Sequence, residues 1–141
     1  MTTLRIGIIG TQAGTTPDQR AAITALLVGI QPAELHHGDC IGADSDIHDI
    51  ARRHTTARVI IHPPDNPTTR AHRQGDEQRT PLPYLVRNHA IVDATDRLVA
   101  APAGPELQRA ATWTTVRYAM RAGRRITIVW PNGSTEERWP A

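Results

Sequence analysis

The stretches GIIGTQAGTT at residues 7–16 and HGDCIGAD at residues 37–44 decide the fold. Each follows an apolar run of strand length and precedes a segment in which apolar residues recur at helical spacing. Both are therefore predicted to be glycine turns from a strand into a helix, where backbone N–H groups and a positive helix terminus point to one place. Such a place suits an anion such as phosphate. These two turns predict a nucleotide-binding protein.

Length and composition limit the class of protein. The 141 residues suit one domain with one core, so a single domain over residues 1–141 is predicted. No apolar run approaches the ~20 residues that span a bilayer, and the first residues show no signal region. The single cysteine, Cys40, excludes an internal disulfide. We expect a cytoplasmic protein without a membrane partner.

The charge pattern does not favour nucleic acid as a partner. All sixteen basic residues are arginines, yet the formal net charge is only +2. The arginines are scattered along the chain and form no stripe of the kind that follows a phosphate backbone.

Strand and helix patterns alternate along the chain, which is typical of a parallel sheet covered on both faces. The sequence therefore predicts an α/β fold with a three-layer, doubly wound, Rossmann-like sheet of about five parallel strands. Residues 63–83 lack periodicity and are predicted to be a lid-like loop, with Arg70, Arg73 or Arg79 reaching a bound phosphate, and residues 131–141 a loosely held tail. Strands are expected at 4–10, 34–37, 58–62, 97–101 and 125–130, and helices at 17–30, 43–54, 84–94 and 107–122.

The first turn has the spacing G-x-x-G-x-x-x-G and lacks the G-x-G-x-x-G fingerprint of dinucleotide enzymes. An ordinary strand-to-helix turn is the alternative to a phosphate site. In the second turn, Asp39 and Asp44 suit two roles, binding ribose hydroxyls or capping the helix. The carboxyl ends of the strands are where such sheets bind ligands, so both turns are expected at one edge.

His36, His37, Asp39 and Cys40 form a cluster that invites a zinc interpretation. Neighbouring residues of a strand face opposite sides, so the two histidines are expected to point apart, and no metal site is predicted. Cys40 is a weak candidate nucleophile, because no third group of a catalytic set is identifiable.

Two later segments carry polar residues with a candidate role in binding. Arg87 and Asn88 lie where the long loop joins the third helix. The run 112–115 (TWTT) places hydroxyl groups inside a helix, where they are unfavourable unless they cap it or meet a ligand. Trp113 suits either a stacking surface for a ligand or the core.

These segments together resemble the SLOG superfamily. The resemblance rests on GDCIGAD at 38–44, Arg87 with Asn88, DRLVAAP at 96–102 and TWTTVRYA at 112–119. The superfamily includes the Lonely Guy phosphoribohydrolases and the Rossmann-like domain of the DNA-processing protein A. The resemblance implies a strand order of 3-2-1-4-5 and a homodimer.

The resemblance leaves catalysis open. Lonely Guy enzymes use an arginine, which Arg87 matches, and the glutamate of a P-G-G-x-G-T-x-x-E motif. Here Thr115 stands where that glutamate is expected, and a hydroxyl cannot replace a carboxylate in acid–base chemistry. Glu106 lies nearby and is the weak alternative, so Arg87 and Glu106 are the candidate catalytic residues.

The leading hypothesis is therefore binding of a nucleotide or nucleotide-derived small molecule at the carboxyl edge of the sheet. The resemblance to the family implies a signalling nucleotide as one such ligand. The alternative is an N-glycosidic phosphoribohydrolase acting on a nucleoside monophosphate, and a DNA-processing accessory is a third possibility. No cofactor and no metal are predicted. The expected ligand-binding residues are Gly10, Thr11, Gln12, Gly14, Gly38, Asp39, Gly42, Ala43, Asp44, Arg87, Asn88, Pro102, Thr112, Trp113, Thr114 and Thr115.

Overall fold

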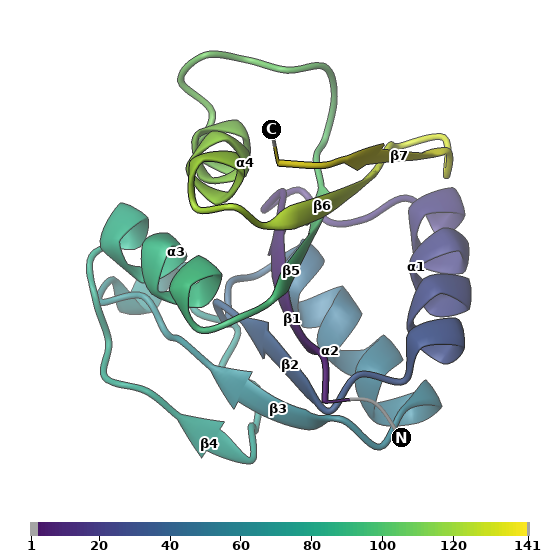
Figure 1. The fold of residues 1–141 in the computed structure, drawn as a ribbon. Helices are drawn as coiled ribbons and strands as arrows, with labels where there is room; N and C mark the ends of the chain where they lie inside the picture. Colours follow the sequence, from purple (N-terminus) through teal and green to yellow (C-terminus); the bar gives the residue numbers. More distant parts are fainter. Residues whose placement is uncertain (1–2, 141) are drawn as a thin grey trace.

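The computed structural model describes residues 3–140 and shows a sheet with helices on both faces (Figure 1). The helices are α1 (Pro17–Ile30), α2 (Ala43–His54), α3 (Tyr84–Asp93) and α4 (Ala111–Arg121), with a 3₁₀ turn η1 (Pro67–Thr69). The strands are β1 (Arg5–Gly10), β2 (Glu34–His37), β3 (Arg58–Ile61), β4 (Glu77–Gln78), β5 (Arg97–Ala101), β6 (Arg125–Val129) and β7 (Thr135–Arg138). Their order in the sheet is β4-β3-β2-β1-β5-β6-β7, and β6–β7 is the antiparallel pair.

Helix α1 begins where its sequence predicts. The Thr16 side chain accepts a hydrogen bond from the Gln19 backbone N–H, and the Gln19 side chain accepts one from the Thr16 backbone N–H. This capping box fixes the start of the helix, and Pro17 supplies a φ that suits the first helical position. The Gln19 amide also donates to the carbonyls of Pro102 and Val129, which ties the start of α1 to the ends of β5 and β6.

The apolar residues of the strands alternate between two helical layers. Ile6 and Ile8 of β1 belong to the cluster under α1 and α2, whereas Ile9 belongs to the cluster under α3 and α4. Leu98 and Val99 of β5 divide in the same way. This period of two fixes the register of the sheet, because a slip of one residue would exchange the two clusters. The predicted α/β architecture between two helical layers is confirmed.

The predicted strand count is wrong, because the sheet has seven strands within residues 3–140 and not five. The full strand order therefore also differs from the prediction, by one added strand at each edge, while the five predicted strands keep the order 3-2-1-4-5 among themselves. The first additional strand, β4, has two residues within the predicted loop 63–83, and it pairs with β3. The second, β7, lies within the predicted tail 131–141. Short and polar edge strands show no apolar alternation, so their sequences carry no strand signal.

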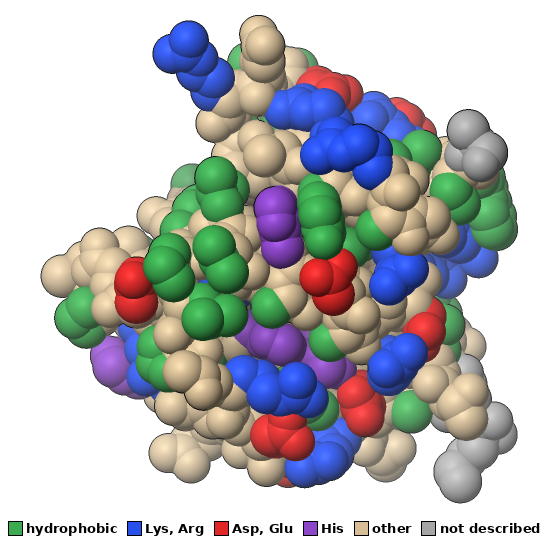
Figure 2. Space-filling model, turned by 60° about the vertical axis from the view of Figure 1, so that its left-hand side comes forward, with side chains coloured by type: hydrophobic (Ala, Val, Ile, Leu, Met, Phe, Trp, Pro, Cys, Tyr) green, Lys and Arg blue, Asp and Glu red, His purple; other side chains and the backbone are tan. Residues whose placement is uncertain are grey.

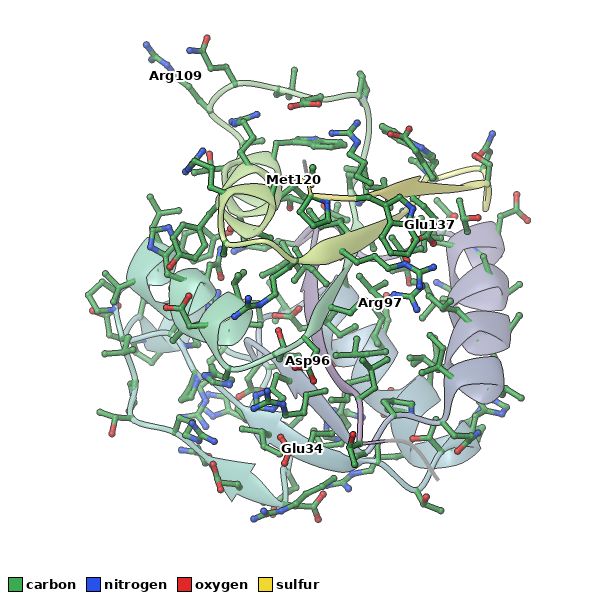
Figure 3. All side chains as sticks on the ribbon, in the orientation of Figure 1. Glu34, Asp96, Arg97, Arg109, Met120 and Glu137 are labelled. Atoms are coloured by element: carbon green, nitrogen blue, oxygen red, sulfur yellow. The ribbon has the colours of Figure 1, made fainter. Side chains whose placement is uncertain are left out.

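Polar contacts hold β7 on the sheet, which corrects the prediction of a loosely held tail. The Thr127 hydroxyl donates to one oxygen of Glu137 at 2.7 Å, and Arg125 Nε donates to the other at 2.8 Å. Arg97 of β5 lies 3.5 Å from the same carboxylate (Figure 3). Glu137 therefore joins β7 to two neighbouring strands.

Helix α4 begins four residues later than the predicted boundary at 107. Residues 102–110 form an excursion after β5 that contains Pro102 and Pro105, and the Leu107 side chain is exposed on it. Because Leu107, the large apolar side chain of this segment, is exposed, a helix here would gain little from packing. Among residues 3–140, none of the helices has the length and apolar character needed to cross a membrane.

Four buried histidines meet in pairs beside the ends of β2 and β3. His36 Nδ1 lies 2.8 Å from His62 Nε2, and His37 Nε2 lies 3.0 Å from His48 Nδ1. The prediction that His36 and His37 point apart is confirmed by these different partners. Burial is the main cause that lowers the pKa of each, to about 4 for His48 and to about 3 for His62.

We expect acid to destabilise the protein through these pairs. A histidine that is neutral in the fold contributes stability above its unfolded pKa of about 6.5, and this contribution is lost as the pH falls toward the folded value. Urea unfolding should show a lower midpoint near pH 5 than near pH 7.5. His62→Gln should reduce this pH dependence, whereas His54→Gln, at an exposed position, should not. Identical pH dependences in the wild type and His62→Gln would contradict the interpretation.

Candidate ligand-binding site

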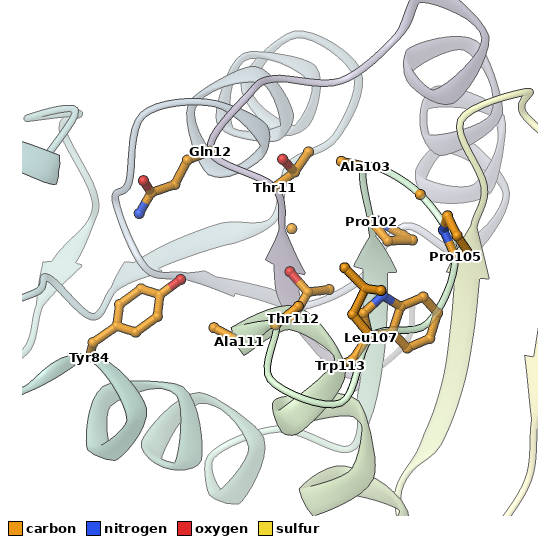
Figure 4. A pocket seen from close by; sticks show the side chains of 13 residues that line it. Thr11, Gln12, Tyr84, Pro102, Ala103, Pro105, Leu107, Ala111, Thr112 and Trp113 are labelled. Carbon is orange, nitrogen blue, oxygen red and sulfur yellow. The ribbon is translucent and has the colours of Figure 1, made fainter.

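A cavity of about 370 Å³ opens at the carboxyl edge of the parallel strands (Figure 4). We call it the α4 cavity, because the first turn of α4 forms its floor. The turn after β1 forms one wall, and the excursion after β5 forms another. Its lining residues are Gly10, Thr11, Gln12, Tyr84, Pro102, Ala103, Gly104, Pro105, Leu107, Ala110, Ala111, Thr112 and Trp113.

The first turn of α4 carries no compensating negative charge. Ala110 is the N-cap, no side chain caps the helix, and no acidic residue lies in the first turn. Thr114 and Thr115 donate their hydroxyls to the carbonyls of Ala110 and Ala111. Thr112, in contrast, lines the cavity, and its hydroxyl has no hydrogen-bond partner within residues 3–140. A positive helix terminus and a free hydroxyl therefore face the same space.

A smaller polar niche of about 10 Å³ adjoins the α4 cavity. The two share Gly10, Gln12, Tyr84 and Thr112 as lining residues, and the niche also reaches Ile9, Cys40, Asp44, Arg87 and Asn88. A niche of this volume is close to the size of one water molecule or one small polar group.

Asp44 is a buried acid in the wall of the niche. Its carboxylate accepts a hydrogen bond from the Cys40 backbone N–H at 3.2 Å. Burial raises the pKa of Asp44 to about 6, against the opposing effect of the Arg87 guanidinium. Burial also raises the pKa of the Cys40 thiol, so the thiolate that a nucleophile requires is disfavoured.

Arg87 is buried behind the niche and connects several elements. It is 2% exposed. One terminal nitrogen donates to the carbonyls of Gly38 and His62, and Nε donates to Asn88 Oδ1 at 2.8 Å. The Asn88 amide in turn donates to the Thr115 hydroxyl at 3.0 Å. Arg87 thereby joins α3 to the turn after β2 and to the end of β3, and Asn88 extends this network to α4.

The glycines of the two turns allow protein segments to pack closely. A Cβ at Gly38 would clash with the Arg87 guanidinium, and a Cβ at Gly10 would clash with Ala43. Gly42 has a φ of +96°, and a Cβ there would meet the backbone of the turn after β1. The two turns are therefore pressed against each other, and their glycines already have a packing role without any ligand.

Two backbone amides at and just before the start of α2 are already bonded within the protein. The Ala43 N–H donates to the Thr11 carbonyl at 2.9 Å, and the Cys40 N–H donates to Asp44. Asp44 and Asp46 also occupy the first turn of α2. The α4 terminus therefore offers an anion more than the α2 terminus does.

The structure brings together part of the predicted site. Residues from all four predicted segments line the α4 cavity or the niche, whereas the remaining residues support these walls from behind or lie elsewhere. The lining set is Gly10, Thr11, Gln12, Asp44, Arg87, Asn88, Pro102, Thr112 and Trp113. The residues that line neither are Gly14, Gly38, Asp39, Gly42, Ala43, Thr114 and Thr115.

Trp113 belongs to the core, which is one of its two predicted roles, and it also lines the α4 cavity. The residue is 2% exposed, and its ring lies 5.5 Å from that of Trp130, centroid to centroid, so it belongs to the core. It also contributes to the wall of the α4 cavity. Tyr84, which was not among the expected ligand-binding residues, lines both the cavity and the niche. Its place directly after Pro83, at the start of α3, was the available signal.

Asp39 holds the loop 63–83 against the turn after β2. Its buried carboxylate accepts hydrogen bonds from Arg70 Nε and from the Arg73 backbone N–H, both at 2.8 Å. The side chain of Arg73 pairs with Asp49, and that of Arg79 pairs with Glu77. The arginines expected to reach a phosphate are thus already in ion pairs within the protein.

Glu106 lies outside the cavity that it was expected to serve. Its carboxylate is paired with Arg117 at 3.0 Å and with Arg138 at 3.3 Å. It does not line the α4 cavity or the niche.

Arg87→Ala should lower the free energy of unfolding by about 3–5 kcal/mol, the cost of breaking a buried charged network. The substitution leaves the Gly38 and His62 carbonyls without their donor and Asp44 without its neighbouring cation. Arg87→Lys should restore only part of the loss, since an ammonium lacks the planar fork. Urea unfolding measures both, with Arg53→Ala at an exposed position as the control. A stable Arg87→Ala variant would show that the network is dispensable.

Comparison with known proteins identifies the fold. No protein-family model matches the chain, and no curated protein matches it. The molybdenum cofactor binding protein from the phototrophic bacterium Rippkaea orientalis superposes with a TM-score of 0.72 at 18% identity, covering 92% of this chain and 78% of that chain. DNA processing protein A from Helicobacter pylori, described for its single-stranded DNA binding mode, gives 0.65 at 17% identity, covering 90% and 65%. The chain shares its fold with these two proteins. The presence of DNA processing protein A among them agrees with the resemblance that the motifs suggested.

Proposed function

We propose that the protein binds a nucleotide or a nucleotide-derived small molecule in the α4 cavity. The observation that carries the proposal is the first turn of α4, where an uncapped positive helix terminus and the free Thr112 hydroxyl face the cavity. A phosphate group fits this end because its oxygens accept from backbone N–H groups and from a hydroxyl. Pro105, Leu107 and Trp113 provide an apolar wall for the rest of the ligand.

Two structures with the same fold support a binding role. One is described as a molybdenum cofactor binding protein, and the other is described for its binding of single-stranded DNA. Ligand binding is therefore known for this fold, while the chemistry of the α4 cavity supports a small anionic ligand in this chain.

The site supports binding more than N-glycosidic hydrolysis. Thr115 is fully buried and donates to the Ala111 carbonyl, so it supplies no carboxylate to the cavity. Glu106 is paired with arginines elsewhere. Asp44 does line the niche, but it lies at the start of α2 and not in the segment where the hydrolase motif carries its glutamate.

Thr112→Val should weaken the binding of a nucleoside monophosphate about tenfold or more, the effect of losing one hydrogen bond to a charged group. Isothermal titration calorimetry with the four common ribonucleoside monophosphates provides the measurement. Thr114→Val is the matched control, because the Thr114 hydroxyl is bonded to the Ala110 carbonyl and lies outside the cavity. Equal losses in the two variants, or no loss in Thr112→Val, would exclude the first turn of α4 as the phosphate site.

We also expect a homodimer that pairs through α3. Apolar side chains gather on the face that carries this helix (Figure 2), where Leu85 and Val86 are 46% and 53% exposed. Exposed apolar side chains that lie side by side are typical of an interface between proteins. Sedimentation equilibrium at tens of micromolar should give twice the 15.5 kDa monomer mass, and Val86→Glu should shift it to the monomer. A wild-type monomer would contradict this expectation.

A further inference from the structure

The α4 cavity has a neighbour on the other side of Gln12 and Tyr84. This second cavity measures about 320 Å³ and is lined by Gln12, Pro64, Asp65, Asn66, Thr69 and Tyr84. We call it the loop cavity, since four of these residues belong to the segment 63–83. Gln12 and Tyr84 line the α4 cavity, the niche and the loop cavity alike. The three spaces therefore adjoin at these two side chains.

The walls of the loop cavity are held by hydrogen bonds of the fold. Asn66 caps η1 by accepting from the Thr68 N–H at 3.0 Å, and the Thr69 carbonyl accepts from the Ile41 N–H at 3.0 Å. The Asp65 N–H donates to the Leu82 carbonyl at 3.0 Å. The loop cavity is thus a preformed part of the edge and not a gap between free segments.

Tyr84 offers an aromatic surface at the junction. It is 38% exposed, and the Arg87 guanidinium lies 5.3 Å from the centroid of its ring. Figure 4 shows Tyr84 and Gln12 across the α4 cavity from Leu107 and Trp113. An aromatic ring in this position can stack with the planar base of a nucleoside on either side.

The two cavities differ in charge. The α4 cavity contains the positive terminus of α4 and no acidic lining residue. The loop cavity contains the carboxylate of Asp65 and the polar side chains of Asn66 and Thr69, and no basic residue. A carboxylate repels phosphate but accepts hydrogen bonds from ribose hydroxyls. The loop cavity therefore suits an uncharged nucleoside, and the α4 cavity suits a phosphate with its own nucleoside.

We infer that the site takes a dinucleotide, that is, two nucleosides joined through phosphate, with one nucleoside in each cavity and the linkage beside the first turn of α4. This inference rests on the proposed function and names the class of its ligand. Each cavity by itself reaches only the lower end of the ~300–1,000 Å³ that small-molecule sites occupy. A mononucleotide would leave one of them empty.

The test compares ligands that contain one and two nucleosides. The probes are the four ribonucleoside monophosphates, the symmetric dinucleoside diphosphates of the same bases, and the dinucleotides joined by one phosphodiester. For one of these two kinds of dinucleotide, calorimetry should show binding at least about tenfold tighter than that of the corresponding monophosphate. The two kinds of dinucleotide distinguish a pyrophosphate linkage from a single phosphate.

Substitutions in the loop cavity then locate the second nucleoside. Thr69→Trp fills the cavity and should remove the excess affinity for the dinucleotide while leaving the monophosphate affinity unchanged. Thr68→Trp is the matched control, since Thr68 is exposed and lines none of the three spaces. Should Thr69→Trp not fold, Asp65→Trp at an exposed position gives the same readout. Asp65→Trp removes a negative charge from the loop cavity, which by itself favours an anionic ligand. A loss of dinucleotide affinity in this variant therefore cannot come from charge repulsion.

The other outcomes separate a failure of the dinucleotide inference from a failure of the proposed function. Equal affinities for monophosphates and dinucleotides, or an unchanged excess in the loop-cavity variants, would overturn the inference and leave the proposed function intact. Binding of none of the probes would overturn the proposed function itself. A single-stranded dodecanucleotide that binds more tightly than every dinucleotide would also overturn the inference and identify single-stranded nucleic acid as the occupant.

Discussion

The buried guanidinium of Arg87 is the interaction on which the edge of the sheet depends. A charged group that is 2% exposed requires partners for nearly every donor. Arg87 finds them in the Gly38 and His62 carbonyls, in Asn88 and in the Cys40 sulfur. Asn88 is on the same helix, and the other partners belong to the segments that follow β2 and β3. The position of α3 relative to β2 and β3 is thereby fixed by hydrogen-bond geometry as well as by apolar packing.

The shape of the site follows from the way in which the two glycine turns pack. Gly42 lies against the turn after β1, and Gly10 lies against Ala43. This contact fills the space beside the start of α2. The uncapped helix terminus and the free Thr112 hydroxyl therefore lie on the other side, at the first turn of α4. Asp39 has a comparable effect on the other side, since it holds the loop 63–83 in place through Arg70 and through the Arg73 backbone. The cavities are what remains between these fixed walls.

Sequence patterns predicted the regular core of the fold well. The capping box of Thr16 and Gln19, the glycine turns and the apolar runs of β1 and β5 all carry local signals, and the elements lie where these signals place them. The edge strands could not be predicted. The two residues of β4 and the polar sequence of β7 become strands only because a neighbouring strand offers free N–H and C=O groups.

The candidate site was predicted in part for a similar reason. A glycine in a turn signals close approach, but the sequence does not say whether a ligand or another segment approaches. Gly38 and Gly42 proved to meet protein atoms. Glu106 looked close to the site along the chain, yet its ion pairs with Arg117 and Arg138 draw it away. Tyr84 gave no periodic signal, because its importance comes from standing where three spaces meet.

The two outermost strands of the sheet, β4 and β7, affect how the molecule can associate with other copies of itself. Strand β4 is too short to serve as a template for another chain, and β7 (Thr135–Arg138) carries three consecutive charged side chains, Glu136, Glu137 and Arg138. A foreign strand that approached either edge would find few free backbone groups or would have to desolvate charges. Growth into extended β-structured aggregates is therefore disfavoured at both ends of the sheet, which leaves the helical faces as the surfaces for association.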